Sequence, residues 1–191
     1  LTEASFAQAV AVQADFGKAE LHDANFCGAA LIEASFDEAA APRADFYKAL
    51  MPSATLRGAT LTEASFAQAV AVKADFGEAD LQGADLTGAN LRCAMFAGAL
   101  NLRSAILDNL RGAILDGLDL TGVDLRGADL RDAKFGGALN LRAATFDNLC
   151  GAILDGLDLT GVDLRGKDLS GASLKETNLS KANLSEANLS K

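Results

Sequence analysis

The sequence has few of the residues from which catalytic, metal-binding and disulfide-linked sites are built. Its 191 residues include one His, one Tyr, no Trp, two Pro and three Cys. Cys27, Cys93 and Cys150 lie far apart with no CxxC pair and no His cluster, so neither a zinc site nor a disulfide framework is indicated. Cysteines without partners favour a reducing compartment, the cytoplasm. We therefore expect no cofactor and no bound metal.

Long hydrophobic runs and an excess of basic residues are also absent. No apolar run approaches the ~18 residues of a membrane helix, and the first residues show no signal-peptide pattern. The formal net charge of −9 argues against binding a phosphate backbone. Half of the residues are apolar, so the chain can bury a core. These features exclude a membrane span and direct nucleic-acid binding, and indicate an acidic protein that acts through its surface.

The dominant feature that is present is a repeat with a period of five. From Ala4 to Ala99, every fifth residue is Ala. Two residues after each Ala, most repeats place a large apolar residue, here called the centre, and all ten Phe residues occupy centres. The unit reads A-[D/N/S]-[L/F]-x-x, as in residues 84–88 (ADLTG). Such self-similarity is the signature of a repeat architecture.

A strict period of five fits neither an α-helix nor a β-strand. In a helix, successive centres would advance by about 140° and would cover all sides. In a strand, they would alternate between the two faces. The backbone must instead turn a corner at every repeat, where Gly, Asn or Asp tolerates the required dihedral angles. Four corners close a square coil of four repeats.

The tandem units resemble the pentapeptide-repeat family over essentially the whole chain. The resemblance implies an all-β fold, a right-handed quadrilateral β-helix solenoid of about 9–10 four-sided coils. In this fold the centre and the Ala two residues before it point inward, and the other three positions face solvent. Coils stacked at ~4.8 Å would form a rod roughly 45 Å long. We expect residues 1–191 to form a single solenoid, with regular coils over 1–98 and two register slips over 99–191.

Longer duplications support this coil. Residues 1–21 recur at 61–81 with three substitutions, an offset that returns equivalent residues to the same face. Residues 96–130 recur at 135–169, and both copies break the period at an ALNL and at a DNL segment. If Leu110 and Leu149 are centres, the offset between these copies equals two coils with one residue deleted. We prefer that interpretation to a three-residue bulge.

Two polar residues bear on the interior and on catalysis. Lys167 occupies the inward position that Ala128 fills in the other copy. Because a buried unpaired ammonium is costly, we expect Lys167 to extend outward past the corner. His22, the only His, lies next to Asp23, and we interpret it as one member of a solvated surface pair. Asp residues before a centre, such as Asp119, are expected to bind corner amides or face water.

These observations favour a protein that is not an enzyme. A rod filled with Leu and Phe has no cavity for a substrate, and no nucleophile, base and orienting group converge in the sequence. The expected function is a non-catalytic binding or scaffold role through the outer faces of the rod, with protein partners. Candidate surfaces follow when the faces are numbered from that of Leu1.

The first candidate is an apolar contact column on face three, whose first centres are Ala11, Leu31, Met51 and Ala71. Apolar residues flank these centres where polar ones are expected, and contiguous patches of ~300–600 Å² mark interaction sites. The alternative is a local flip of the pleat that turns the flanking residues inward and the centres outward. The column consists of Val10, Val12, Ile32, Leu50, Val70 and Val72.

The second candidate is an acidic ladder on face two, with side chains expected about one coil apart. Some members of the pentapeptide-repeat family protect DNA gyrase by imitating the width and charge of a DNA duplex. The resemblance therefore implies an alternative function, an acidic DNA mimic that binds a type II topoisomerase. Arg126 and Arg165 on the same face weigh against it. The ladder consists of Asp45, Asp85, Asp108, Asp124, Asp147 and Asp163.

The third candidate is a homodimer contact. The terminal coils of a solenoid expose core and strand edges unless they are capped. Family members commonly dimerise end to end through C-terminal coils, and the apolar column offers a competing lateral route. We expect a homodimer, with an end-to-end contact through Leu174, Leu179, Leu184 and Leu189.

Overall fold

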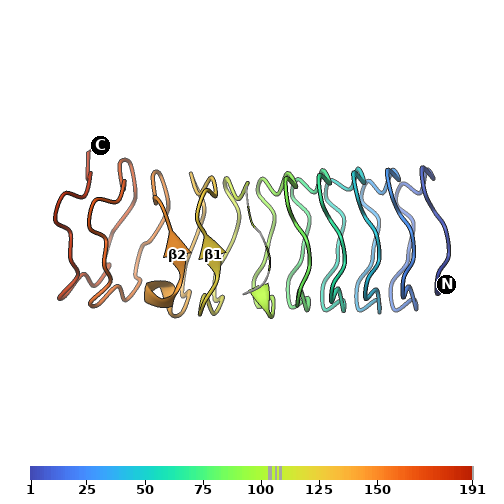
Figure 1. Cartoon of the computed structure of the whole chain (residues 1–191), viewed down its shortest axis with the longest axis horizontal. Coiled ribbons are helices and arrows are strands. Elements are labelled where there is room, and N and C mark those ends of the chain that lie inside the picture. Colours follow the sequence, from blue (N-terminus) through green and yellow to red (C-terminus); the bar gives the residue numbers. More distant parts are fainter. Residues whose placement is uncertain (103–104, 106, 108, 191) are drawn as a thin grey trace.

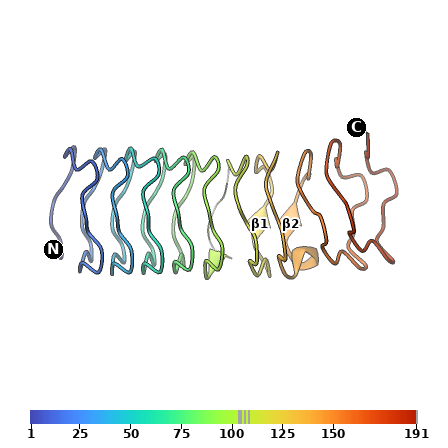
Figure 2. The same ribbon diagram turned by 180° about the vertical axis from the view of Figure 1, so that it is seen from behind.

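A computed structural model describes residues 1–102, 105, 107 and 109–190. The chain winds into a rod of stacked coils, with the N-terminus at one end and the C-terminus at the other (Figures 1 and 2). Residues one coil apart pair in parallel, as Ser5 does with Asn25 and Asn25 with Asp45. The interval between paired residues spans four repeats, so each coil has four sides. The expected quadrilateral β-helix is therefore confirmed.

Each repeat turns at a corner that one hydrogen bond closes. At residues 41–44, the amide of Ala44 donates to the carbonyl of Ala41 at 3.3 Å. Arg43, the third residue of this turn, has a φ of +55°. A positive φ at this position alone is the pattern of a type II turn. Pro42 and Pro52 occupy the second position of their turns, where a fixed negative φ is favoured.

The extended part of a repeat is so short that most of the pairing consists of isolated bridges. Among the described residues, longer elements occur only where the period breaks. The strands β1 (Asp124–Leu125) and β2 (Thr145–Phe146) pair in parallel. A 3-10 helix, η2 (Leu141–Ala143), precedes β2.

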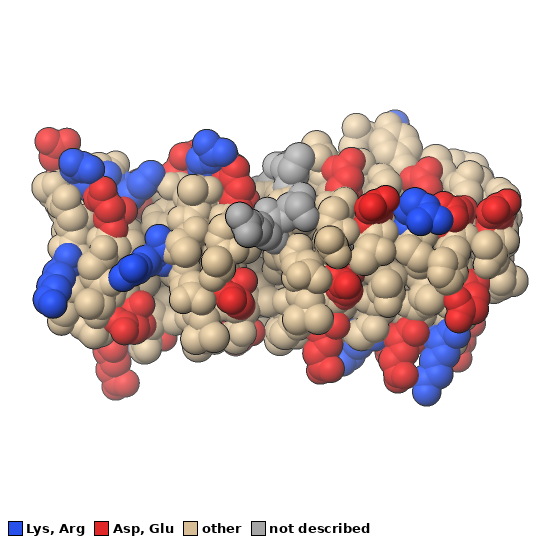
Figure 3. Space-filling model, turned by 60° about the horizontal axis from the view of Figure 1, so that its bottom comes forward, with Lys and Arg blue, Asp and Glu red and all other residues tan. Residues whose placement is uncertain are grey.

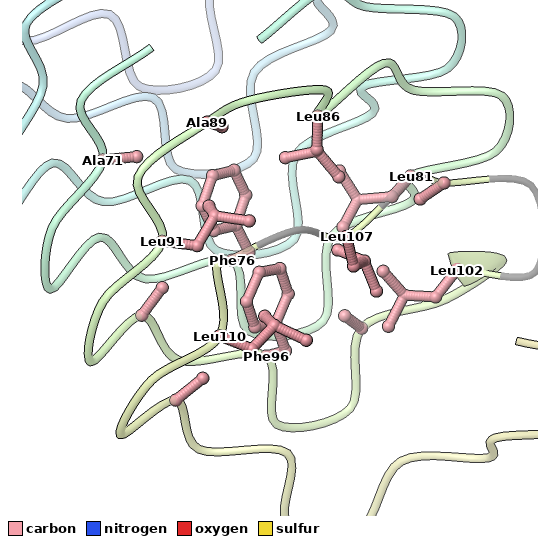
Figure 4. Close-up of a cluster of buried hydrophobic side chains, with 14 of the residues drawn as sticks. Ala71, Phe76, Leu81, Leu86, Ala89, Leu91, Phe96, Leu102, Leu107 and Leu110 are labelled. Atoms are coloured by element: carbon pink, nitrogen blue, oxygen red, sulfur yellow. The ribbon is translucent and has the colours of Figure 1, made fainter. Parts of the chain in front are cut away.

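Centres and Ala side chains fill the interior of the rod. Phe26, Phe46 and Phe66 are fully buried and stack face to face along one side, with ring centroids 5.0 and 4.7 Å apart. Phe36, on the opposite side, meets Phe46 edge to face at 5.3 Å. Figure 4 shows labelled centres from several coils converging on the same interior. The predicted inward register is confirmed.

Asp and Asn residues before the centres satisfy the amides of the corners. The Oδ1 atom of Asp45 accepts a hydrogen bond from the Tyr47 amide at 2.8 Å, and Asp85 accepts from the Thr87 amide at 2.9 Å. Where this position carries Thr, an Asp of the preceding coil can serve, as Asp37 does for the Arg57 amide. The repeated acids are thus structural acceptors, as expected.

The register slips combine one insertion with a two-residue deletion. Asn140 is inserted in a left-handed conformation (φ 59°, ψ 27°), and Leu141 after it takes the buried centre. Further along, the buried centres Phe146 and Leu149 are only three positions apart. Asn101 (φ 60°) precedes the buried Leu102 in the same way.

The net result is the loss of one residue in two coils. Ile114 pairs with Lys134 one full coil later, but Lys134 pairs with Ile153, which is one position short of a full coil. This spacing confirms the interpretation of the duplication, and the alternative of a three-residue bulge is wrong.

Lys167 was expected to extend outward past the corner. Its ammonium group does not extend freely into solvent. Lys167 is half-buried, and its Nζ donates to the carbonyl oxygen of Phe146 at 2.7 Å while lying 5.7 Å from the centre of that ring. In a regular repeat the turn amide would bind this carbonyl, but no backbone amide of the described residues does so here. The deletion before Leu149 therefore leaves an acceptor, and Lys167 satisfies it.

Lys167→Met is expected to lower the free energy of unfolding by about 1–3 kcal/mol, because the Phe146 carbonyl would lose its donor. Urea denaturation measures the difference. Lys175→Met, at an exposed side chain in the next repeat, serves as the control and should change stability by less than about 0.5 kcal/mol. Equal effects of the two substitutions would contradict this role of Lys167.

Candidate interaction surfaces

The apolar column of face three points to solvent. Val10 is 82% exposed, Val12 46%, Leu50 41% and Val70 36%, whereas Ile32 and Val72 are half-buried. The centres Leu31, Met51 and Ala71 between them are fully buried. The pleat of face three therefore keeps the regular orientation, and the alternative of a local flip is wrong.

The backbone of this column offers free donors. The residues before its centres are apolar, so the amides of Val12, Ile32 and Val72 have no acceptor among the described residues, and Pro52 has no amide. The column ends where Asn90 again accepts from the next corner amide, that of Arg92, at 3.3 Å. Face three thus combines apolar side chains with exposed N–H groups over four coils.

Little charge borders the column. The corner rows on its two sides contain Lys48, Glu33 and Lys73 as their charged residues. Glu33 accepts a hydrogen bond from the side-chain amide of Gln13 at 2.9 Å. In a chain with a net charge of −9, this surface is close to neutral. It therefore does not require a basic partner.

The acidic ladder of face two is interrupted. Asp45 and Asp85 both pair with Ser65, which lies in the coil between them, and Asp124 pairs with Thr145. The expected spacing of one coil is wrong, because neutral residues occupy the intervening coils.

Two further ladder residues need separate mention. Asp147 is not in the bridge column: it lies at a corner, where its Oδ2 accepts from the Gly127 amide at 3.0 Å. The two-residue deletion places it there. Asp108 lies outside the described residues.

Arginines neutralise the remaining ladder residues of the C-terminal half. Arg126 lies 2.6 Å from Asp124, and Arg165 lies 2.9 Å from Asp163. The hydrogen bonds from Arg126 hold the pKa of Asp124 well below its usual range. On the side shown in Figure 3, acidic and basic side chains lie next to one another in mixed groups and form no continuous acidic band.

The four leucines of the proposed end contact differ in exposure. Leu174, Leu179 and Leu184 are partly buried and pack against the core, whereas Leu189 is 52% exposed. They belong to the last coils of the rod (Figure 1).

Two exposed leucines were missed in the sequence. Leu100 and Leu139 are 55% and 58% exposed, because each occupies the outward position before a centre, like Asp80 and Asp119 with which they pair. The inserted Asn101 and Asn140 leave the buried centre to the leucine that follows them. Each borders a cleft on face one. The larger, of about 830 Å³, is lined in part by Leu139, Asn140, Arg142, Asp158 and Thr160. The smaller, of about 330 Å³, is lined by equivalent residues, including Leu100, Asn101, Asp119 and Thr121. In the sequence, the ALNL segment could have indicated these exposed leucines, because only one of its two leucines can fill the centre.

The only histidine of the sequence contacts a different acidic residue from the one expected. His22 lies 3.3 Å from Glu20 rather than against Asp23, which pairs with Arg43 at 2.7 Å. Across the described part of the chain, no three His, Cys, Asp or Glu side chains gather as metal ligands would. None of its helices has the length and hydropathy needed to cross a bilayer.

Comparisons with known proteins agree with this architecture. The sequence matches the family of pentapeptide repeats in eight copies, over residues 1–37, 19–58, 43–76, 53–88, 72–108, 109–139 and 152–190. No curated protein sequence matches the chain.

The solved structure of HetL, a pentapeptide repeat protein involved in heterocyst differentiation regulation in the cyanobacterium Nostoc sp. strain PCC 7120, is similar. The two chains are 31% identical, with a TM-score of 0.57 over 98% of this chain and 85% of HetL. A pentapeptide repeat protein of the Arabidopsis thaliana thylakoid lumen is 28% identical, with a TM-score of 0.39 over 63% of this chain and 65% of its own.

QnrB1, a plasmid-mediated fluoroquinolone resistance protein, also matches. It is 17% identical, with a TM-score of 0.34 over 97% of this chain and 89% of QnrB1. This likeness is too low to bear on the partner of the chain. The repeat unit, the four-sided coil and the family match together show that the chain belongs to the pentapeptide-repeat family, a family of right-handed quadrilateral β-helices, and indicate no enzymatic family.

Proposed function

We propose that this chain is a non-catalytic binding rod that presents the apolar column of face three to a protein partner. The observation that carries the proposal is the exposure of Val10, Val12, Leu50 and Val70 in three of four successive coils, with the half-buried Ile32 in the remaining one. Exposed apolar patches of this kind mark interaction surfaces on soluble proteins.

The dimensions of the column favour a short segment of the partner. Four coils at ~4.8 Å cover about 15–20 Å along the rod. A stable interface between two folded proteins usually buries about 800 Å² on each side, more than such a strip provides. A single apolar segment of the partner can cover it.

The chemistry of the column narrows the partner further. The free amides of Val12, Ile32 and Val72 call for hydrogen-bond acceptors, and Lys48 and Lys73 border the strip. We therefore expect an apolar segment that carries carbonyl or carboxylate acceptors and no basic cluster. The regulatory role of HetL is compatible with action through such protein contacts.

The alternative, an acidic mimic of DNA that binds gyrase, has weaker support. Duplex DNA carries one negative charge per ~1.7 Å of its axis. A net charge of −9 along a rod of roughly 45 Å corresponds to one per about 5 Å. Inhibition of gyrase supercoiling at stoichiometric concentration would favour this alternative over the apolar column.

The expected homodimer remains a separate proposal. Contact through Leu174, Leu179, Leu184 and Leu189 and lateral contact through the column both predict a dimer in sedimentation at micromolar concentration. Substituting Leu189 by Lys should weaken only the end-to-end form. A monomer at all concentrations would contradict both routes.

The binding proposal is tested with matched surface variants. Peptides selected from a random library on the immobilised protein should lose at least about tenfold in affinity when Val10→Lys and Val70→Lys are combined, since charges would enter the apolar contact. Ser5→Lys with Ser65→Lys is the control, because these residues occupy the same repeat position in the same coils, on face two. Equal binding to both variants would refute the column as the site.

A further inference from the structure

A second surface, on face one, is independent of the apolar column. We propose that it binds a helical segment of a protein partner. On one face of this helix, apolar and basic side chains alternate at intervals of three or four residues, that is, half a heptad. The surface is here called the acid–leucine stripe and consists of Asp80, Leu100, Asp119, Leu139 and Asp158.

The stripe is a line of successive coils. Asp80 pairs with Leu100, and Asp119 pairs with Leu139. Leu100 and Asp119 line the smaller cleft together, and Leu139 and Asp158 line the larger one. An acid and an exposed leucine therefore alternate at the coil spacing of ~4.8 Å. The same local structure is built twice, once in each copy of the second duplication, beside both leucines.

The carboxylates of the stripe lack the arginines that neutralise other faces. Asp80, Asp119 and Asp158 have no ion-pair partner among the residues that the structure describes. By contrast, Asp124, Asp129 and Asp163 each pair with an arginine two residues later. The corresponding residues in the stripe are the neutral Gln82, Thr121 and Thr160.

Neutral donors hold these carboxylates in place. Asp119 accepts hydrogen bonds from the hydroxyl of Thr121 at 2.7 Å and from the side-chain amide of Asn140 at 2.9 Å. Asp80 accepts from Asn101 at 2.7 Å. The bonds from Asn140 and Thr121 lower the pKa of Asp119, and those from Thr160 lower that of Asp158. The stripe thus presents fixed negative charges at neutral pH, which favours a basic partner.

The spacing matches an α-helix better than an extended strand. Half a heptad advances about 5.3 Å along a helix, close to the ~4.8 Å between coils, so five coils accumulate a mismatch of only about 2 Å. Side chains on one face of an extended strand lie ~6.8 Å apart, so after two coils they no longer coincide with the side chains of the stripe. A helix laid along the rod can therefore place apolar residues on Leu100 and Leu139 and basic residues on the acids.

The two clefts give room for the apolar side chains of this helix. Arg142 is the basic residue among those that line the larger cleft, and the described residues that line the smaller one include no basic side chain. Because Arg142 would repel a lysine there, we expect the partner's apolar side chains to enter the clefts and its basic ones to reach the acids between them.

The probe is a synthetic peptide of three heptads with Leu at the first and Lys at the fifth position of each, and Ala or Gln elsewhere. A control peptide of the same length and composition carries the three Leu and three Lys in scrambled order, so that they no longer share one face of the helix. Fluorescence anisotropy at low salt should show at least about tenfold tighter binding of the heptad peptide, and this preference should weaken as salt increases. Equal binding of the two peptides would overturn the proposal.

Variants of the chain test the two components separately. Leu100→Ser with Leu139→Ser should weaken binding of the heptad peptide about tenfold. Combined Asp80→Asn, Asp119→Asn and Asp158→Asn should weaken it similarly at low salt and remove most of its salt dependence. Asn retains the corner hydrogen bond, as Asn178 shows by accepting from the Ser180 amide at 3.1 Å on this same face.

The matched control changes acids on another face. Asp45→Asn with Asp85→Asn on face two should leave binding of the heptad peptide within about twofold, as should Val10→Lys with Val70→Lys on face three. If these controls weaken binding as much as the stripe variants do, the contact is non-specific and the proposal fails. Loss of the face-three site alone would leave this result unchanged, so the two proposals fail separately.

Discussion

Phe46→Ala is expected to lower the free energy of unfolding by about 3–5 kcal/mol. Phe46 is fully buried and contacts three other rings, with centroids 4.7 Å from Phe66, 5.0 Å from Phe26 and 5.3 Å from Phe36. The substitution removes the transfer free energy of the ring, leaves a cavity and breaks a stack that continues along the rod. Urea denaturation at neutral pH measures the loss.

Phe6→Ala is the matched control for this experiment. Phe6 occupies the same face in the first coil, but it is only half-buried and contacts two rings, Phe26 at 4.8 Å and Phe16 at 5.4 Å. Because solenoid stability is close to a sum of local terms and contacts between neighbouring coils, we expect less than half of the loss at Phe46. A loss below about 1 kcal/mol for Phe46→Ala would contradict the inward register.

Ala64→Lys is expected to cost about 3–5 kcal/mol, because it would bury a charge without a partner. Ala64 is fully buried. The carbonyl of Ala41, which corresponds in the preceding coil to the one that Lys167 uses, already accepts from the Ala44 amide at 3.3 Å. Lys167 stands at the same repeat position without this penalty, because the Phe146 carbonyl is free to accept from its Nζ. The unfolding free energy again measures the effect.

Glu63→Lys provides the comparison for Ala64→Lys. Glu63 is the exposed residue next to Ala64 at the same corner. Its φ is +58°, and Lys73 has a similar φ, so this backbone conformation accepts a lysine. The substitution should change stability by less than about 0.5 kcal/mol. A similar cost at both positions would show that the corner, rather than burial of the charge, limits substitution.

The candidate surfaces were only partly predictable from the sequence. Val10 and Val70 were correctly expected to lie outside, because their position relative to the centre is local information. The spacing of the acidic ladder was wrong, because neutral residues such as Ser65 separate its members. In addition, Asp147 has the right residue type but lies at a corner. Leu100 and Leu139 were missed, because two leucines on either side of an Asn do not reveal which of them is buried.

By itself, the sequence determined the turn at every fifth residue, the residues that point inward and the family. Each follows from steric and solvation demands that act within one repeat. Only the tertiary structure decided how the second duplication divides into an inserted Asn140 and a two-residue deletion before Leu149. It likewise decided that Lys167 finds a free carbonyl. It also decided that Asp80, Asp119 and Asp158 have no ion-pair partner among the described residues, unlike Asp124, Asp129 and Asp163. These outcomes depend on hydrogen bonds and ion pairs between neighbouring coils, which join residues a full coil apart in the sequence, and no local pattern encodes them.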